Sequence, residues 1–220
     1  MDPAVPPPES LTRRQRMIVL VIAVVCAATR LLALARSVWD WDEALFVMAL
    51  RDYDVTLHHP HPPGFPVYIA LANLAKLVVH DNFRALQSVN LVAAMLVFPA
   101  LFLFARELRL RFATCVMAAA LFAFFPNVWF FGGGAFSDIP SIVLVLFAVT
   151  FLLRGARDRT AYWIGTLLLA LAIGIRPQNL LVGLIPGIYA TSRRRPHEIA
   201  IALLIGVVVV TAAFGGAIYA

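Results

Sequence analysis

The apolar run MIVLVIAVVCAATRLLALA, residues 17–35, decides what kind of fold this chain can have. It follows Arg13, Arg14 and Arg16, and its one charged residue is Arg30. At about 19 residues it approaches the ~20 that cross a bilayer and exceeds the ~7–15 of a signal-peptide core. We therefore predict a retained first membrane span with a cytosolic N-terminus. We expect Arg30 to snorkel toward the outer interface.

The whole chain has the composition of a polytopic membrane protein. Of its 220 residues, 62% are hydrophobic and 14% are charged, whereas soluble domains have roughly half and a quarter. The net charge of +6 does not indicate nucleic-acid binding, because the arginines lie between apolar runs, where the positive-inside rule places them. Cys26 and Cys115 lie within apolar stretches, so the sequence predicts neither a disulfide framework nor a cysteine metal cluster.

The arginines also constrain how often the chain crosses the membrane. If every further apolar segment crossed, the loops that begin at Arg106, Arg154 and Arg193 would face outward, against the positive-inside rule. Removing one earlier crossing moves all three loops inside. The weakest candidate contains Pro66 and is short, so we place it in the outer interface. In order, the apolar segments that follow the first span are 64–79, which we place in the interface, and then 86–105, 112–131, 138–153, 161–175, 179–190 and 199–219.

These arguments predict an all-α polytopic membrane protein with about seven transmembrane helices. Residues 37–85 form a large first external loop that contains juxtamembrane helices. We expect residues 1–12 to be a disordered cytosolic tail, and residues 13–220 to be one transmembrane module. The chain stops in an apolar run, so we expect this module to be incomplete at its C-terminus. The sequence contains no N-glycosylation sequon, which favours a bacterial inner membrane.

Polar residues gather in the three predicted outer segments. Carboxylates at a membrane boundary are costly near hydrocarbon, so they indicate a functional site. A carboxylate can take a proton from an incoming hydroxyl group, and arginine can bind a phosphate by a bidentate contact. The candidate catalytic residues are Asp42, Glu43 and Asp138, and the candidate substrate-binding residues are His61, Arg176 and Gln178.

Each candidate also has a structural explanation. Asp40 and Glu43 have the spacing of a helix capping box. Ser137, which precedes an acidic residue, is typical of a helix N-terminus. Arg176 could be an interfacial anchor instead of a phosphate ligand. The histidines of the external loop could hold a divalent metal together with the acids, or they could be polar loop residues, because their spacing matches no strong metal signature.

Three motifs resemble those of one enzyme superfamily. Asp42-Glu43-Ala44-Leu45-Phe46 resembles the Asp-Glu motif in the first external loop of protein O-mannosyltransferases. His61-Pro62-Pro63 resembles the Pro-Pro entry to the following helix in bacterial aminoarabinose transferases. Gly134-Ala135-Phe136-Ser137-Asp138 resembles the second acidic motif of the oligosaccharyltransferase catalytic subunit, which also has a juxtamembrane helix in the place of 64–79. Most of 17–190 thus resembles the GT-C superfamily of integral-membrane glycosyltransferases, although metal-dependent relatives carry more carboxylates in the second motif.

The resemblance implies transfer of a sugar from a polyprenyl-phosphate donor to an acceptor glycan, lipid or protein on the extracytoplasmic face. It implies a single displacement with inversion, with Asp42 as the general base and Arg176 on the departing phosphate. Glu43 and Asp138 are expected to orient the acceptor, to position Asp42 or to hold a cation. One rival class is a transporter or lipid flippase, because intramembrane charges also mark substrate paths. Another is a non-catalytic membrane scaffold of the same superfamily.

Overall fold

The computed structural model describes residues 6–219, and within them the regular structure is helical. One isolated antiparallel β-bridge joins Asp54 and His59 in this part of the chain. The predicted all-α class is therefore confirmed. In order, the elements are α1 (Arg13–Arg30), η1 (Leu31–Ala33), α2 (Trp41–Ala49), η2 (Val55–Leu57), α3 (Pro66–Ala75), α4 (Asn82–Glu107), α5 (Phe112–Ala123), α6 (Pro126–Phe131), α7 (Asp138–Gly155), α8 (Arg159–Ile175), α9 (Asn179–Thr191) and α10 (Pro196–Tyr219).

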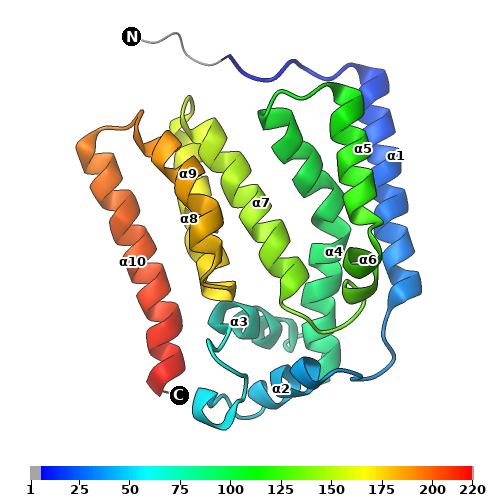
Figure 1. The fold of residues 1–220 in the computed structure, drawn as a ribbon. Coiled ribbons are helices and arrows are strands. Elements are labelled where there is room, and N and C mark those ends of the chain that lie inside the picture. Colours follow the sequence, from blue (N-terminus) through cyan, green and yellow to red (C-terminus); the bar gives the residue numbers. More distant parts are fainter. Residues whose placement is uncertain (1–5, 220) are drawn as a thin grey trace.

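Helix α7 lies in the middle of a bundle of helices that run alongside one another (Figure 1). It packs most extensively against α8 and α4, and it also packs against α9. Helices α1 and α5 pack against α4, while α10 contacts α8 and α3. The short helices α2 and α3 lie across one end of the bundle, at the bottom of Figure 1. The segment 37–85 thus contains helices, as predicted.

Four helices are long and apolar enough to cross a membrane. They are Arg13–Ala33, Asn82–Glu107, Asp138–Gly155 and Pro196–Gly216. Helices α5, α8 and α9 are apolar but have 12, 17 and 13 residues, fewer than the ~20 of a straight crossing. The structure therefore supports a helical membrane protein, and seven crossings remain a prediction.

The predicted span 112–131 consists of two helices. Helix α5 ends at Ala123, and α6 begins at Pro126. Proline lacks a backbone N–H and disfavours helical backbone in the residue before it. Phe125 accordingly has extended dihedral angles, φ −59° and ψ 130°. The break therefore follows from the sequence at Pro126, although the apolar pattern runs through it.

Arg30 occupies the break between α5 and α6. Its side chain is fully buried and donates hydrogen bonds to the carbonyl oxygens of Ala123 and Val128. The last carbonyl groups of a helix have no partner within the helix, so Arg30 satisfies that of Ala123, where α5 ends. The expectation that Arg30 snorkels to the interface is therefore wrong, because the helix end offers acceptors inside the bundle.

The N-terminal segment lies against the loop that joins α4 and α5. Thr12 and Gln15 form a capping box that begins α1. Residues 6–11 carry no regular secondary structure. The carbonyl oxygen of Pro6 accepts a hydrogen bond from Arg109 of that loop, and that of Glu9 accepts one from Arg106 in the last turn of α4. Residues 1–5 of the expected tail lie outside the described residues.

The bundle has two chemically different ends. The basic end, at the top of Figure 1, consists of residues 9–16, 106–111, 154–159 and 193–198. The site end, at the bottom, consists of residues 34–81, 132–138 and 176–178. Every candidate catalytic or substrate-binding residue lies at the site end, and every arginine-rich loop lies at the basic end. The partition of charge predicted from the sequence is therefore present in the fold.

Candidate functional site

Asp42 lies in the first turn of α2 with its carboxylate exposed. Asp40 caps this helix by accepting the backbone N–H of Asp42 at 2.9 Å, so the capping explanation for Asp40 is confirmed. The Asp42 side chain is 51% exposed, and its Oδ1 lies 3.9 Å from Nδ1 of His61. That separation is too long for a hydrogen bond. The carboxylate can therefore take a proton from an incoming group.

Glu43 is fully buried and joins two loops. Its Oε2 accepts the backbone N–H of Trp39 at 3.0 Å, and its Oε1 accepts the backbone N–H of Ala135 at 2.6 Å. In the predicted capping box Glu43 would accept the backbone N–H of Asp40, but in the structure it accepts that of Trp39, one residue earlier. Both oxygens bind backbone, so Glu43 fixes α2 against the turn at 132–134. Of the roles expected for it, positioning Asp42 is the one that fits these contacts.

Two amide side chains of α4 hold the same glycine turn from the other side. Gln87 donates to the carbonyl oxygen of Gly133 at 2.7 Å, and Asn90 donates to that of Gly134 at 2.8 Å. Both side chains are buried. A Cβ atom on Gly133 would lie 1.8 Å from the carbonyl oxygen of Ala33, so the close approach of the two backbones requires glycine there.

Aromatic side chains hold His61 beside Asp42. The centre of its ring lies 5.8 Å from that of Phe46 and 4.8 Å from that of Phe65. Its Nδ1 is buried and has no hydrogen-bond partner among the described residues. Buried polar atoms are normally paired, so Nδ1 of His61 is an unsatisfied polar atom that lies 3.9 Å from the Asp42 carboxylate.

Tyr53 fixes the loop that carries His61. Its hydroxyl group donates to the carbonyl oxygen of Gly64 at 2.9 Å, and burial raises the pKa of Tyr53 to about 12. Gly64 has φ +94°, a backbone conformation that side chains disfavour. The loop thus reaches α3 with a defined geometry.

Arg176, at the turn between α8 and α9, points at the start of α7. Its Nη2 donates to Oδ2 of Asp138 at 2.7 Å and to Oγ of Ser137 at 3.0 Å, and its Nε donates to the same Oγ at 3.1 Å. Among the described residues these bonds use only the Nε and Nη2 edge of the guanidinium group. Nη1 is therefore left for a ligand.

The hydroxyl group of Ser137 does not cap α7. Ser137 precedes that helix, but its side chain makes no capping hydrogen bond. It accepts from Arg176 instead, and it is fully buried. The capping explanation weighed for this hydroxyl group is wrong, because the residue already has helical dihedral angles (φ −83°, ψ −10°), whereas a capping residue is extended.

Phe65 connects the two halves of the site. Its ring packs against that of His61, and Cζ of Arg176 lies 5.4 Å from the centre of the same ring. Asp42, His61, Phe65 and Arg176 thus form a continuous row of contacts, which we call the site row. The first external loop and the α8–α9 turn meet here, and Asp138 joins them through Arg176.

Gln178 lies at the same turn as Arg176, with an exposed side chain. Its neighbour Asn179 is buried and donates to Oγ of Ser141 at 2.9 Å and to the carbonyl oxygen of Ala172 at 2.7 Å. Asn179, which the sequence placed in the same predicted outer turn without a role in the site, therefore fixes the turn. Gln178 stays exposed beside the site row, where it can meet a substrate.

Tyr68 of α3 is another polar residue that the sequence did not indicate. Its side chain is fully buried, and its hydroxyl group has no hydrogen-bond partner among the described residues. Burial, helped by the negative charges of Glu43 and Asp138, raises the pKa of Tyr68 well above its usual value, and Arg176 opposes this shift. Tyr68 thus lies beneath the site, but an isolated tyrosine in an apolar run carries no sequence signal.

Among the described residues, no three His, Cys, Asp or Glu side chains gather to hold a metal ion. Asp42 and His61 supply two such groups, fewer than the ligand sets of metal sites.

No protein-family model, curated protein or solved structure matches this chain.

Proposed function

We propose that this protein is a membrane glycosyltransferase that moves a sugar from a polyprenyl-phosphate donor to a hydroxyl group of a glycan, lipid or protein. The observation that carries the proposal is the site row. It places an exposed carboxylate and an arginine with an unused Nη1 on either side of Phe65. Transfer from a lipid phosphate needs both a base for the acceptor and a cation for the leaving group.

Asp42 is the general base of this mechanism. As the acceptor oxygen attacks the anomeric carbon, its proton passes to the Asp42 carboxylate. The bond between that carbon and the phosphate oxygen breaks at the same time, so the configuration inverts. The exposure of Asp42 lets an acceptor approach, while Glu43 fixes the helix that carries it and His61 lies beside its carboxylate.

Arg176 stabilises the departing polyprenyl phosphate. Asp138 and Ser137 hold its Nε and Nη2, which leaves Nη1 for a phosphate oxygen. A positioned cation in a water-poor site stabilises developing negative charge with little reorganisation. Asp138 is therefore a positioning residue for Arg176, and Gln178 offers an amide group to the sugar or the phosphate at the same turn.

The distribution of charge supports an orientation for this reaction. The positive-inside rule places the basic end in the cytosol, so the site end faces the periplasm of a bacterial inner membrane. The chain then crosses seven times, with α5 and α6 together forming one crossing, and α2 and α3 rest in the outer interface. The bilayer delivers the lipid-linked donor to the site end.

The test is transfer of radiolabelled sugar from a polyprenyl-phosphate donor, with purified protein in liposomes. Asp42→Asn should lower transfer by about 10²–10⁴-fold, the worth of a general base. Arg176→Gln should lower it by about 10²–10³-fold, the worth of one charge-stabilising donor. Asp52→Asn, which changes an exposed acid of the same loop, is the matched control and should leave transfer unchanged.

Undiminished transfer by Asp42→Asn would remove Asp42 from the mechanism. The same liposomes separate the rival classes. Movement of the lipid donor across the bilayer without sugar transfer would identify a flippase. A protein with neither activity, in which Asp42→Asn and Arg176→Gln alter only folding, would be a scaffold.

A further inference from the structure

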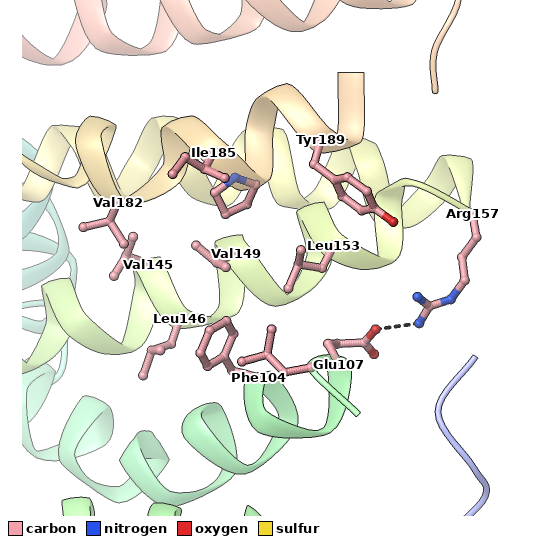
Figure 2. A pocket seen from close by; sticks show the side chains of 12 residues that line it. Phe104, Glu107, Val145, Leu146, Val149, Leu153, Arg157, Val182, Ile185 and Tyr189 are labelled. Carbon is pink, nitrogen blue, oxygen red and sulfur yellow. Dashed lines mark hydrogen bonds and ion pairs between the residues drawn. The ribbon is translucent and has the colours of Figure 1, made fainter. Parts of the chain in front are cut away.

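A cavity of about 570 Å³ lies between α4, α7 and α9, away from the site row (Figure 2). Its walls are mostly apolar and include Phe104 and Val149. It opens to the side of the bundle, because two of its lining residues, Val182 and Ile185, are 55% and 77% exposed. The volume is within the ~300–1,000 Å³ of ligand-binding cavities. In a membrane protein such an opening faces lipid.

Polar groups gather at one end of this cavity, which belongs to the basic end of the bundle. Figure 2 shows Glu107 paired with Arg157 there, with the Tyr189 hydroxyl group directed toward the same end. Glu107 is 1% exposed and also pairs with Arg154, at 2.5 Å. One carboxylate between two guanidinium groups leaves one net positive charge at the mouth of an apolar cavity.

Arg157 can still bind another anion. Among the described residues it donates to Glu107 through Nη2, at 2.6 Å, and a guanidinium group has five N–H donors. Its side chain is 21% exposed. Its backbone position, just after α7, places the charge where the headgroups of one leaflet would lie if α7 crosses the membrane.

We infer that this cavity binds an anionic phospholipid, with an acyl chain between α7 and α9 and the phosphate group on Arg157. The apolar walls select a hydrocarbon chain, and the lateral opening means that it comes from the bilayer. The uncompensated positive charge selects an anionic headgroup over a zwitterionic one, as basic pockets between transmembrane helices do. This lipid site is independent of the proposed sugar transfer.

The test is native mass spectrometry of the full chain, purified in detergent with equal amounts of phosphatidylglycerol and phosphatidylcholine of the same acyl chains. The wild-type protein should retain phosphatidylglycerol about fivefold better, the worth of one basic residue at an anionic membrane surface. Arg157→Gln should abolish this preference, and Arg157→Lys should keep most of it. Arg111→Gln, an exposed arginine of the same end outside the cavity, should behave as wild type.

A second pair of variants tests the cavity itself. Val182→Trp fills the lateral opening and should lower retention of both lipids, whereas Leu121→Trp, on the exposed face of α5, should lower neither. Equal retention of the two lipids by the wild-type protein would overturn the inference. It would also be overturned if Arg111→Gln reduced the preference as much as Arg157→Gln, because the selectivity would then belong to the general charge of the surface.

Discussion

Replacing Glu43 by glutamine should destabilise the site end more than any other change of a single carboxylate to an amide there. The glutamine side chain has the same size but only one acceptor oxygen, so one of the two backbone N–H groups, at Trp39 or Ala135, loses its acceptor. A hydrogen bond to a charged group contributes about 1.5–3 kcal/mol, and an unpaired buried donor costs about 1–3 kcal/mol. We expect a net loss of about 3 kcal/mol in the free energy of unfolding.

Thermal unfolding in detergent measures this loss. For a chain of this length, about 1 kcal/mol corresponds to about 2–4 °C in Tm, so Glu43→Gln should lower Tm by about 6–12 °C. Hydrogen exchange of the peptide that spans 132–137 should also accelerate, because the Ala135 amide loses its acceptor. Asp52→Asn is the control, since Asp52 is exposed in the same loop. The reasoning fails if the two variants have the same Tm and the exchange of 132–137 is unchanged.

Two further variants test the local structure. Gly133→Ala should lower the free energy of unfolding by about 1–3 kcal/mol, the usual cost of overpacking, because its Cβ would lie 1.8 Å from the Ala33 carbonyl oxygen. Gly187→Ala is the matched control in the same thermal assay, because no atom lies within 4 Å of its Cβ. Equal Tm values for the two variants would contradict the close packing of Gly133 against Ala33. Hydrogen bonds from the Thr56 side chain and backbone hold the pKa of Asp54 below its usual value. The Asp54 carboxylate therefore stabilises the 55–57 turn fully above about pH 4, the pKa of unfolded aspartate. This stabilisation is lost as the pH falls through the depressed pKa. Hydrogen exchange of 55–59, corrected for intrinsic exchange rates, should therefore increase on acidification in the wild-type protein but not in Asp54→Asn, and equal pH profiles would contradict this assignment.

The sequence predicted the features that depend on composition and chain order. Apolar runs located the helices, and the positions of the arginines predicted which loops share an end of the bundle. Asp40 marked the start of α2, because a capping side chain acts within a few residues. The single span predicted over 112–131 missed the break before Pro126. The candidate residues Asp42 and Arg176 were assigned to one face, and the structure connects them through His61 and Phe65.

The features that the sequence did not predict depend on partners far along the chain. Gln87 and Asn90 lie inside an apolar run, and their role becomes visible only where they meet the glycine turn more than 40 residues later. Arg30 was expected at the interface because its acceptors, created by a helix break 93 residues away, have no local sequence signature. Local patterns report on propensity and burial, but not on which distant backbone group a buried side chain will meet.

Accessibility of single cysteines in whole cells tests the central claim, that the site row lies on one side of the membrane and the arginine-rich loops lie on the other. Cys26 and Cys115 are buried, so a variant without them provides the background for Asp52→Cys, Gln178→Cys and Ser192→Cys, which place thiols at exposed positions. A membrane-impermeant maleimide should label positions 52 and 178 in intact cells and position 192 only after permeabilisation. Labelling of 52 and 178 from opposite sides would contradict the account.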